Sequence, residues 1–143
     1  ENIELALEIS KDPLDPKKVL EDVGLKERMN NFPPQLSGGE QQRVSIARAI
    51  ARDPEIYIFD DSFSALDYKT DSILRKELKK YTKDATCMIV AQRIGTIIHA
   101  DKIVVLDEGE CVGIGTHKEL LKTCEVYKEI ALSQLSKEEL ENE

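Results

Sequence analysis

The chain has no tryptophan, only three cysteines, and no uninterrupted apolar run longer than the five residues from Cys87 to Ala91. Such a run is far too short to cross a membrane as a helix. Three widely spaced cysteines fit no zinc or redox pattern, and we expect them to be buried small hydrophobic residues in a reducing compartment. The first ten residues, ENIELALEIS, contain neither the basic start nor the long apolar stretch of a secretory signal.

Positive charge is scarce as well. Lysine and arginine number 20 against 28 aspartates and glutamates, so the formal net charge is −8. Proteins that neutralise phosphate backbones need clustered basic residues, and we therefore expect no nucleic-acid partner. A chain of 143 residues, 41% of them hydrophobic and 34% charged, is long enough for one globular domain with a sizeable core.

Helical and strand-like segments alternate along the chain, which predicts an α/β fold with one mostly parallel sheet flanked by helices. Asp15 and Pro16 have the residue types of a helix start, and Gly24 those of a helix end. The tract 29–35 holds two prolines and predicts a loop. The expected strands lie near 56–60, 86–91, 102–107 and 111–115, the first two of them buried, and the expected helices lie near 37–52, 67–81, 94–98 and 117–123.

The most informative motif is the run LSGGEQQR, Leu36 to Arg43. A serine and two glycines at the start of a helix present several unpaired backbone N–H groups and no side chain that blocks close approach. The helix dipole adds positive potential at the same place, which suits a phosphate group. The same residues are also compatible with an ordinary capped helix after a glycine-rich turn.

A pair of carboxylates follows the first predicted strand, at Asp60 and Asp61. Open α/β sheets bind ligands at the carboxyl ends of their strands. A carboxylate at that position can hold a hydrated magnesium ion. The segment SALD, Ser64 to Asp67, comes directly afterwards.

Three motifs in this order and spacing resemble those of the ATP-binding cassette (ABC) ATPases. LSGGEQQR resembles their signature, IYIFDD their Walker B strand and SALD their D-loop. MIVAQR resembles their switch segment, and VVLDEGECVGIGTHKELL resembles the end of such domains. The resemblance implies a P-loop NTPase-like fold with ATP and Mg2+ as cofactors. It implies ATP-binding roles for Ser37, Gly38, Gly39, Glu40, Gln41 and Asp67, a metal-binding role for Asp60, and catalytic positions for Asp61 and Gln92.

A P-loop is the missing part. Its phosphate cradle needs a Gly-Lys pair, and none of the seven glycines here is followed by lysine. We therefore expect residues 1–143 to form one incomplete ABC ATPase domain without the P-loop and the antiparallel β-subdomain. The expected parts are a helical signature subdomain (1–54), the core sheet with its helices (55–116) and C-terminal helices (117–143). Whether this chain is itself an enzyme stays open at this point.

Two positions depart from the family pattern. Asp61 stands where the family has a catalytic glutamate, and Gln92 stands where it has the switch histidine. From Phe59 onward the sequence resembles the degenerate subunit of heterodimeric ABC multidrug exporters. The first half, with FPPQLSGGEQQR, resembles the ATPase subunits that serve lipoprotein-release and macrolide-efflux permeases. A natural recombinant, an engineered fusion and plain divergence are all compatible with this mosaic.

The resemblance implies ATP binding and hydrolysis at a dimer interface to drive membrane transport, in the direction of efflux. Its partners would be a second nucleotide-binding domain and a transmembrane permease, which would hold it at the cytoplasmic side of the cell membrane. One alternative is the ATPase head of a DNA-repair or chromosome-maintenance protein, which the charge of −8 disfavours. Another is a truncated module without catalytic activity.

Overall fold

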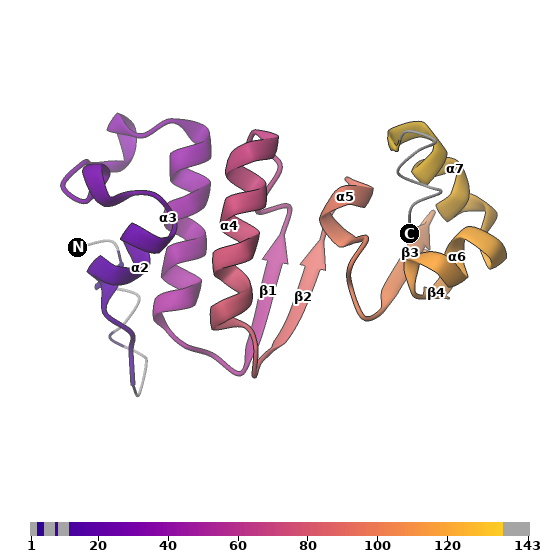
Figure 1. Ribbon diagram of the computed structural model, residues 1–143, viewed down its shortest axis with the longest axis horizontal. Coiled ribbons are helices and arrows are strands. Elements are labelled where there is room, and N and C mark those ends of the chain that lie inside the picture. The colour runs from indigo at the N-terminus through magenta and orange to yellow at the C-terminus, as the bar shows by residue number, and fades with distance from the viewer. Residues whose placement is uncertain (1–2, 5–7, 9–11, 136–143) are drawn as a thin grey trace. The chain divides into compact units, whose positions relative to one another are not determined.

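A computed structural model of the chain describes residues 3–4, 8 and 12–135. The chain divides into two compact units, residues 1–90 and 91–143, and each is described by itself (Figure 1). The first unit contains α2 (Pro16–Asp22), α3 (Gly38–Ala51), β1 (Ile56–Asp60), α4 (Tyr68–Tyr81) and β2 (Thr86–Val90). The second contains α5 (Ile94–Ile97), β3 (Ile103–Asp107), β4 (Glu110–Gly115), α6 (His117–Thr123) and α7 (Glu125–Gln134). The predicted division at residues 54 and 116 stays a prediction.

Polar side chains fix the starts of the helices where the sequence predicts them. Asp15 accepts a hydrogen bond from the backbone N–H of Lys17 at 3.0 Å, and Pro16 occupies the first helical position of α2. Thr116 and Glu119 form a reciprocal capping box at α6. The predicted loop 29–35 contains a short 3-10 helix, Pro33–Gln35, because the Gln35 side chain accepts the N–H of Phe32 at 2.7 Å.

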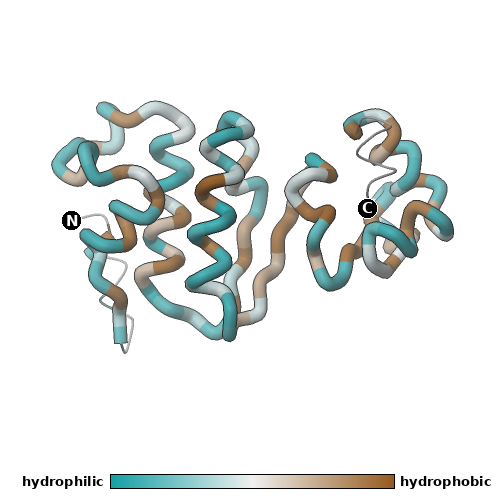
Figure 2. Tube along the Cα trace, in the orientation of Figure 1, coloured by the Kyte–Doolittle hydropathy of each residue, from teal (hydrophilic) through white to brown (hydrophobic). Residues whose placement is uncertain are grey.

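The parallel pairing predicted for the first two strands is confirmed. β1 and β2 run parallel, in register from Ile56 opposite Thr86 to Asp60 opposite Val90. Helices α3 and α4 lie to the same side of this two-stranded sheet (Figure 1). Tyr57 and Phe59 on β1 point into the core that contains residues of these helices. Figure 2 shows hydrophobic residues along both strands and alternating hydrophobic and polar residues along α4.

The prediction that both strands are buried is wrong for the described residues, because only one face of the sheet is covered. Ile56 and Ile58 are 61% and 66% exposed on the other face of β1, and Met88 on β2 is 56% exposed. Cys87 on β2 and Cys111 on β4 are also exposed, so only Cys124 is the buried cysteine that the sequence predicts.

The second sheet is an antiparallel hairpin. β3 pairs with β4 from Ile103 opposite Gly115 to Asp107 opposite Glu110, with an irregularity after Val105. Glu108 and Gly109 have φ angles of 47° and 84°, the positive values that a tight two-residue hairpin turn requires at both central positions. The described strands thus form two separate two-stranded sheets, and the predicted single sheet through all four is wrong. In the described part of the chain, β3 and β4 pair only with each other, across the hairpin turn.

Long-range contacts hold each unit together. In the first unit, the Tyr81 hydroxyl donates to the Asp22 carboxylate and links α4 to α2. Arg43 on α3 donates to the carbonyl oxygens of Val23 and Gly24, at 3.3 and 3.1 Å, beyond the last turn of α2. In the second unit, α6 and α7 pack on the hairpin around Leu120, Tyr127 and Ala131. Within the described part of the chain, no helix has the length and apolar character needed to cross a membrane.

A substitution at Gly113 tests the packing of the second unit. A Cβ atom there would lie 3.0 Å from both the Cys124 sulfur and a Leu120 methyl carbon. We expect Gly113→Ala to lower the free energy of unfolding by about 1–3 kcal/mol, as overpacking of a core typically does. The control is Gly95→Ala, because its Cβ atom would meet no other described residue within 4 Å beyond its chain neighbours and its own helix backbone. Urea unfolding of both variants measures the difference, and equal midpoints would contradict the packing described here.

Tyr57 tests the core of the first unit. Its hydroxyl is buried without a hydrogen-bond partner among the described residues, and burial raises the pKa of Tyr57 to about 12. Because an unsatisfied buried polar group costs about 1–3 kcal/mol, we expect Tyr57→Phe to be at least as stable as wild type. The matched control is Tyr127→Phe, which removes a hydroxyl that bonds to His117 at 2.8 Å. This variant should lose about 1 kcal/mol of its free energy of unfolding. Thermal unfolding of a Tyr57→Phe variant below wild type would contradict this assignment.

Candidate functional site

The segment that resembles the ABC signature forms an open helix start. Ser37 has an extended backbone and caps α3: its hydroxyl accepts the N–H of Glu40 at 3.3 Å. Ser37 and Gly38 are both exposed. Apart from its chain neighbours and its own helix backbone, no atom of the described residues lies within 4 Å of the position that a Cβ atom of Gly38 would take. The first backbone N–H groups of the helix therefore border open space, where an anion can approach them.

Glu40 is held inside this motif. Its carboxylate accepts the N–H of Ser37 at 2.8 Å and the Arg28 side chain at 2.9 Å. These hydrogen bonds, first that from the Ser37 backbone, lower the pKa of Glu40. The carboxylate therefore stabilises the fold of the signature segment, and Arg28 balances its negative charge close to the helix start.

Gln41 holds the loop before the signature. Its side-chain amide donates to the carbonyl oxygens of Pro33 and Leu36, at 3.1 and 3.0 Å. The side chain is therefore turned toward residues 33–36. Of the five predicted ATP-binding residues at this helix start, Ser37, Gly38 and Gly39 offer hydroxyl and amide groups, whereas Glu40 and Gln41 position the segment.

The two carboxylates lie at the carboxyl end of β1. Asp60 is the last residue of the strand and is exposed. Asp61 follows it, and its N–H donates to Val90 at 3.0 Å, one step beyond the end of β1. Asp61 has a φ angle of 49°, in the left-handed region that aspartate and asparagine tolerate better than most other residues. Aspartate is thus compatible with this backbone conformation, which no short-range pattern of residues indicates.

The chemistry of these groups fits part of a Mg-ATP site. Magnesium is usually bound by one or two protein carboxylates together with water and the phosphates of the substrate. Asp60 would be the protein carboxylate in such a site. When bound, the ion would neutralise charge on the phosphates. Asp60, Asp61 and the start of α3 are exposed groups of the first unit whose chemistry suits a metal ion or a phosphate.

Asp67 begins α4. Its carboxylate accepts the N–H of Thr70 at 3.0 Å and the Thr70 hydroxyl at 2.7 Å. These bonds, chiefly that from the hydroxyl, lower the pKa of Asp67. The aspartate predicted to bind ATP thus serves as a helix cap here and fixes the end of the loop 61–67.

The start of α3 and the loop 61–67 contact one another. Gln42 donates to the Ser64 hydroxyl at 3.2 Å and accepts the N–H of Ala65 at 3.0 Å. At Gly39, a Cβ atom would lie 3.2 Å from the Ala65 carbonyl oxygen, a tighter contact than most Cβ atoms make, so the two segments approach closely here. Gln42 was not among the predicted site residues, because only the fold brings it to the loop.

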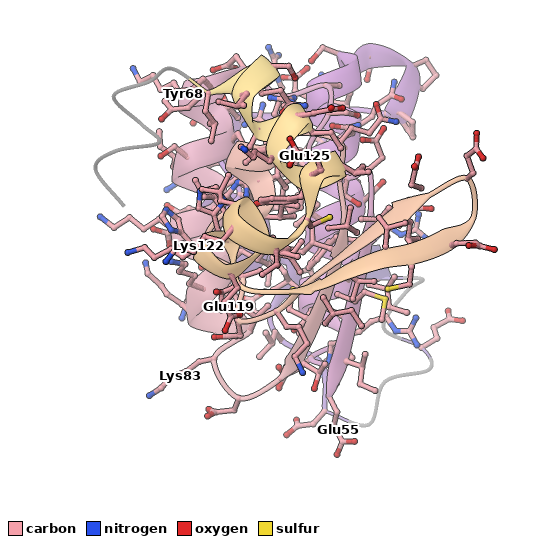
Figure 3. All side chains as sticks on the ribbon, turned by 90° about the vertical axis from the view of Figure 1, so that its right-hand side faces the viewer. Glu55, Tyr68, Lys83, Glu119, Lys122 and Glu125 are labelled. Atoms are coloured by element: carbon pink, nitrogen blue, oxygen red, sulfur yellow. The ribbon has the colours of Figure 1, made fainter. Side chains whose placement is uncertain are left out.

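The predicted residues of the first unit therefore gather at one end of it. Figure 3 labels Tyr68, directly after Asp67, at the opposite end from Glu55 and Lys83. Figure 1 shows the start of α3 and the end of β1 at this same end of the unit. The sequence predicts Asp60 at this end, because open α/β sheets bind ligands at the carboxyl ends of their strands. The chain reverses direction between α3 and β1, which brings the signature segment to the same end.

Gln92 belongs to the second unit. Its carbonyl oxygen accepts a hydrogen bond from the Gln134 side chain at 2.9 Å, and the other amide atom of Gln134 accepts the N–H of Ile94, also at 2.9 Å. The segment of Gln92 is thus pinned to α7. Nothing in the spacing of the sequence indicates the role of Gln134.

Comparison with known proteins gives a consistent family. The sequence profile of the family described as ABC transporter matches residues 4–64. An ABC transporter ATP-binding protein of Mycobacterium bovis is 47% identical over 111 residues, which cover 78% of this chain and 19% of that protein. An ATP-binding/permease protein of Staphylococcus aureus, named for multidrug export, is 47% identical over 95 residues, 66% of this chain and 16% of that protein.

A solved structure supports the same family. The structure of a bacterial Atm1-family ABC exporter with ATP bound superimposes with a TM-score of 0.81 and 27% sequence identity, covering 95% of this chain and 26% of that one. The chain thus spans about a fifth of the length of the curated relatives it matches. With LSGGEQQR at an open helix start and Asp60 at the end of a parallel strand, it belongs to the ABC transporter ATP-binding proteins, as part of their nucleotide-binding domain.

Proposed function

We propose that the chain takes part in ATP binding and hydrolysis in a transporter that exports its substrate. The proposal rests on one observation. The helix that begins openly at Ser37 to Gly39 contacts the loop 61–67, which follows Asp60. This arrangement supplies phosphate-binding amides, a magnesium ligand and a second carboxylate at one end of a single unit. The exporter names of two relatives support the direction of transport.

The site needs groups from outside this chain. Nucleotide would lie between the P-loop of one nucleotide-binding domain and the signature of another, with a permease as the membrane partner and the cytoplasmic side as the location. Ser37 and the Gly38 and Gly39 amides would contact the γ-phosphate held by the partner domain. Asp60, Asp61 and Gln92 would serve the P-loop of their own domain.

The two unusual side chains predict a slow site in their own domain. Asp61 is one methylene shorter than glutamate, and a misplacement of about 1 Å can lower a rate on the order of 100-fold. Gln92 can donate a hydrogen bond but cannot carry a proton or a charge. The signature residues are intact, so they would support the competent site of the partner domain.

The chain alone should bind Mg-ATP weakly or not at all, because it contains no Gly-Lys pair and hence no P-loop cradle for the β- and γ-phosphates. Isothermal titration of the 143-residue chain with Mg-ATP measures this directly. The expected result is no saturation at millimolar nucleotide. A dissociation constant of a few micromolar would contradict the proposal.

In the whole transporter, Gly38→Asp should nearly abolish ATP hydrolysis. The position has open space, so the helix accommodates the side chain. The added carboxylate would repel the γ-phosphate and displace it from the amides. Loss of one such preorganised donor costs about 3 kcal/mol, or on the order of 100-fold in rate. Ser72→Asp, an exposed position on α4 with the same change of charge, is the control and should leave hydrolysis unchanged.

Asp61→Asn in the same transporter should change hydrolysis little, because its site already lacks the reach of glutamate and the switch histidine. Asparagine tolerates the left-handed backbone of this position, so the variant should fold. If Asp61→Asn stops turnover while Gly38→Asp does not, the assignment of the two sites is reversed. If both stop it, Asp61 is a working catalytic carboxylate in a homodimer.

A further inference from the structure

We propose that Gln42 is a positioning residue for hydrolysis, which fixes the loop 61–67 against the start of α3. Its amide makes two bonds to this loop, donating to Ser64 Oγ at 3.2 Å and accepting the Ala65 N–H at 3.0 Å. The inference rests on the proposed function. It adds a role for the Gln42 side chain, which holds the signature segment and the loop after the carboxylates together within one chain.

The loop has little freedom at its other contacts. Phe63 is buried, stacks at a tilt on Phe59 with ring centroids 5.6 Å apart, and lies under the Arg75 guanidinium at 5.1 Å. Arg75 in turn makes a two-pronged ion pair with Asp71, at 2.9 and 2.7 Å. The loop is thus fixed to β1 and α4 by apolar packing, and Gln42 is the polar link from α3.

Ser64 connects this link to the backbone of Asp61. Its hydroxyl donates to the Asp61 carbonyl oxygen at 3.0 Å while accepting from Gln42. A chain of two hydrogen bonds therefore runs from α3, one turn after Ser37, to the backbone of Asp61. A Cβ atom at Gly39 would lie 3.2 Å from the Ala65 carbonyl oxygen, so the two segments also approach closely there. Loosening of the loop would therefore be passed to the start of α3 and its amides.

The experiment uses the whole transporter with Gln42→Ala. The change leaves the signature residues and the carboxylates themselves unaltered, so ATP should still bind. The start of α3, which would serve the competent site of the partner domain, loses its fixed position against the loop. We expect kcat to fall on the order of 10- to 100-fold, with KM for ATP within about twofold of wild type. Gln42→Glu keeps the acceptor for the Ala65 N–H and should recover most of the rate. Ser45→Ala, whose hydroxyl bonds within α3 to Gln41, is the control without effect.

The double variant Gln42→Ala, Ser64→Ala separates positioning from general damage. If the two residues act through one link, adding Ser64→Ala to Gln42→Ala should cause no further loss of kcat, whereas independent effects would multiply. Three results would overturn the inference. The first is a wild-type kcat in Gln42→Ala, and the second is multiplying losses of kcat in the double variant. The third is an equal loss of kcat in Gln42→Ala and Gln42→Glu, with a matching drop in Tm. If the wild-type transporter itself hydrolyses no ATP, the proposed function fails instead.

Discussion

The burial of one face of β1 under α3 and α4 is the constraint on which the first unit depends. Tyr57 and Phe59 provide that face, and the four residues between Ala51 and Ile56 force the chain to reverse direction between α3 and β1. The start of α3 must therefore lie at the same end as the carboxyl end of β1. Packing of apolar side chains thus brings a phosphate-binding helix start and two carboxylates together without any direct attraction between them.

The polar contacts at this end then set finer positions. Glu40 and Gln41 use their side chains inside the signature segment, Asp67 caps α4, and Gln42 joins the loop to α3. The groups left to face a ligand are few, chiefly the first amides of α3 and the exposed carboxylates of Asp60 and Asp61. Most polar residues of the conspicuous motifs thus serve to hold this small set in place.

Features that depend on neighbours in the sequence could be predicted, such as the helix start at Asp15 and Pro16 and the capped start of α3 at Ser37. The parallel pairing of β1 with β2 also followed from two short apolar runs separated by a helix. The exposure of Ile58 and Met88 could not be predicted, because the same apolar run is typical of strands covered on one face or on both. A pattern in the sequence says that a surface is apolar, and only the fold says what covers it.

The candidate site shows the same limit. The residue types of Ser37 and Asp60 point to phosphate and magnesium, and their spacing is that of a known family. The left-handed backbone of Asp61, the link from Gln42 to Ser64 and the bond from Gln134 to Gln92 join residues that are distant in sequence or depend on local backbone geometry. Such contacts arise from packing and have no short-range signal in the sequence.

In the proposed function, the Gly38 and Gly39 amides of this chain face the γ-phosphate of ATP held by a partner domain. The most direct measurement is the 15N amide spectrum of the assembled nucleotide-binding dimer, labelled at glycine and assigned with Gly38→Ala, in the presence of Mg-ATP or Mg-ADP. We predict that the Gly38 and Gly39 signals shift with Mg-ATP but not with Mg-ADP, since only ATP carries the γ-phosphate. Identical signals for both glycines in the two nucleotides would contradict this placement of the γ-phosphate.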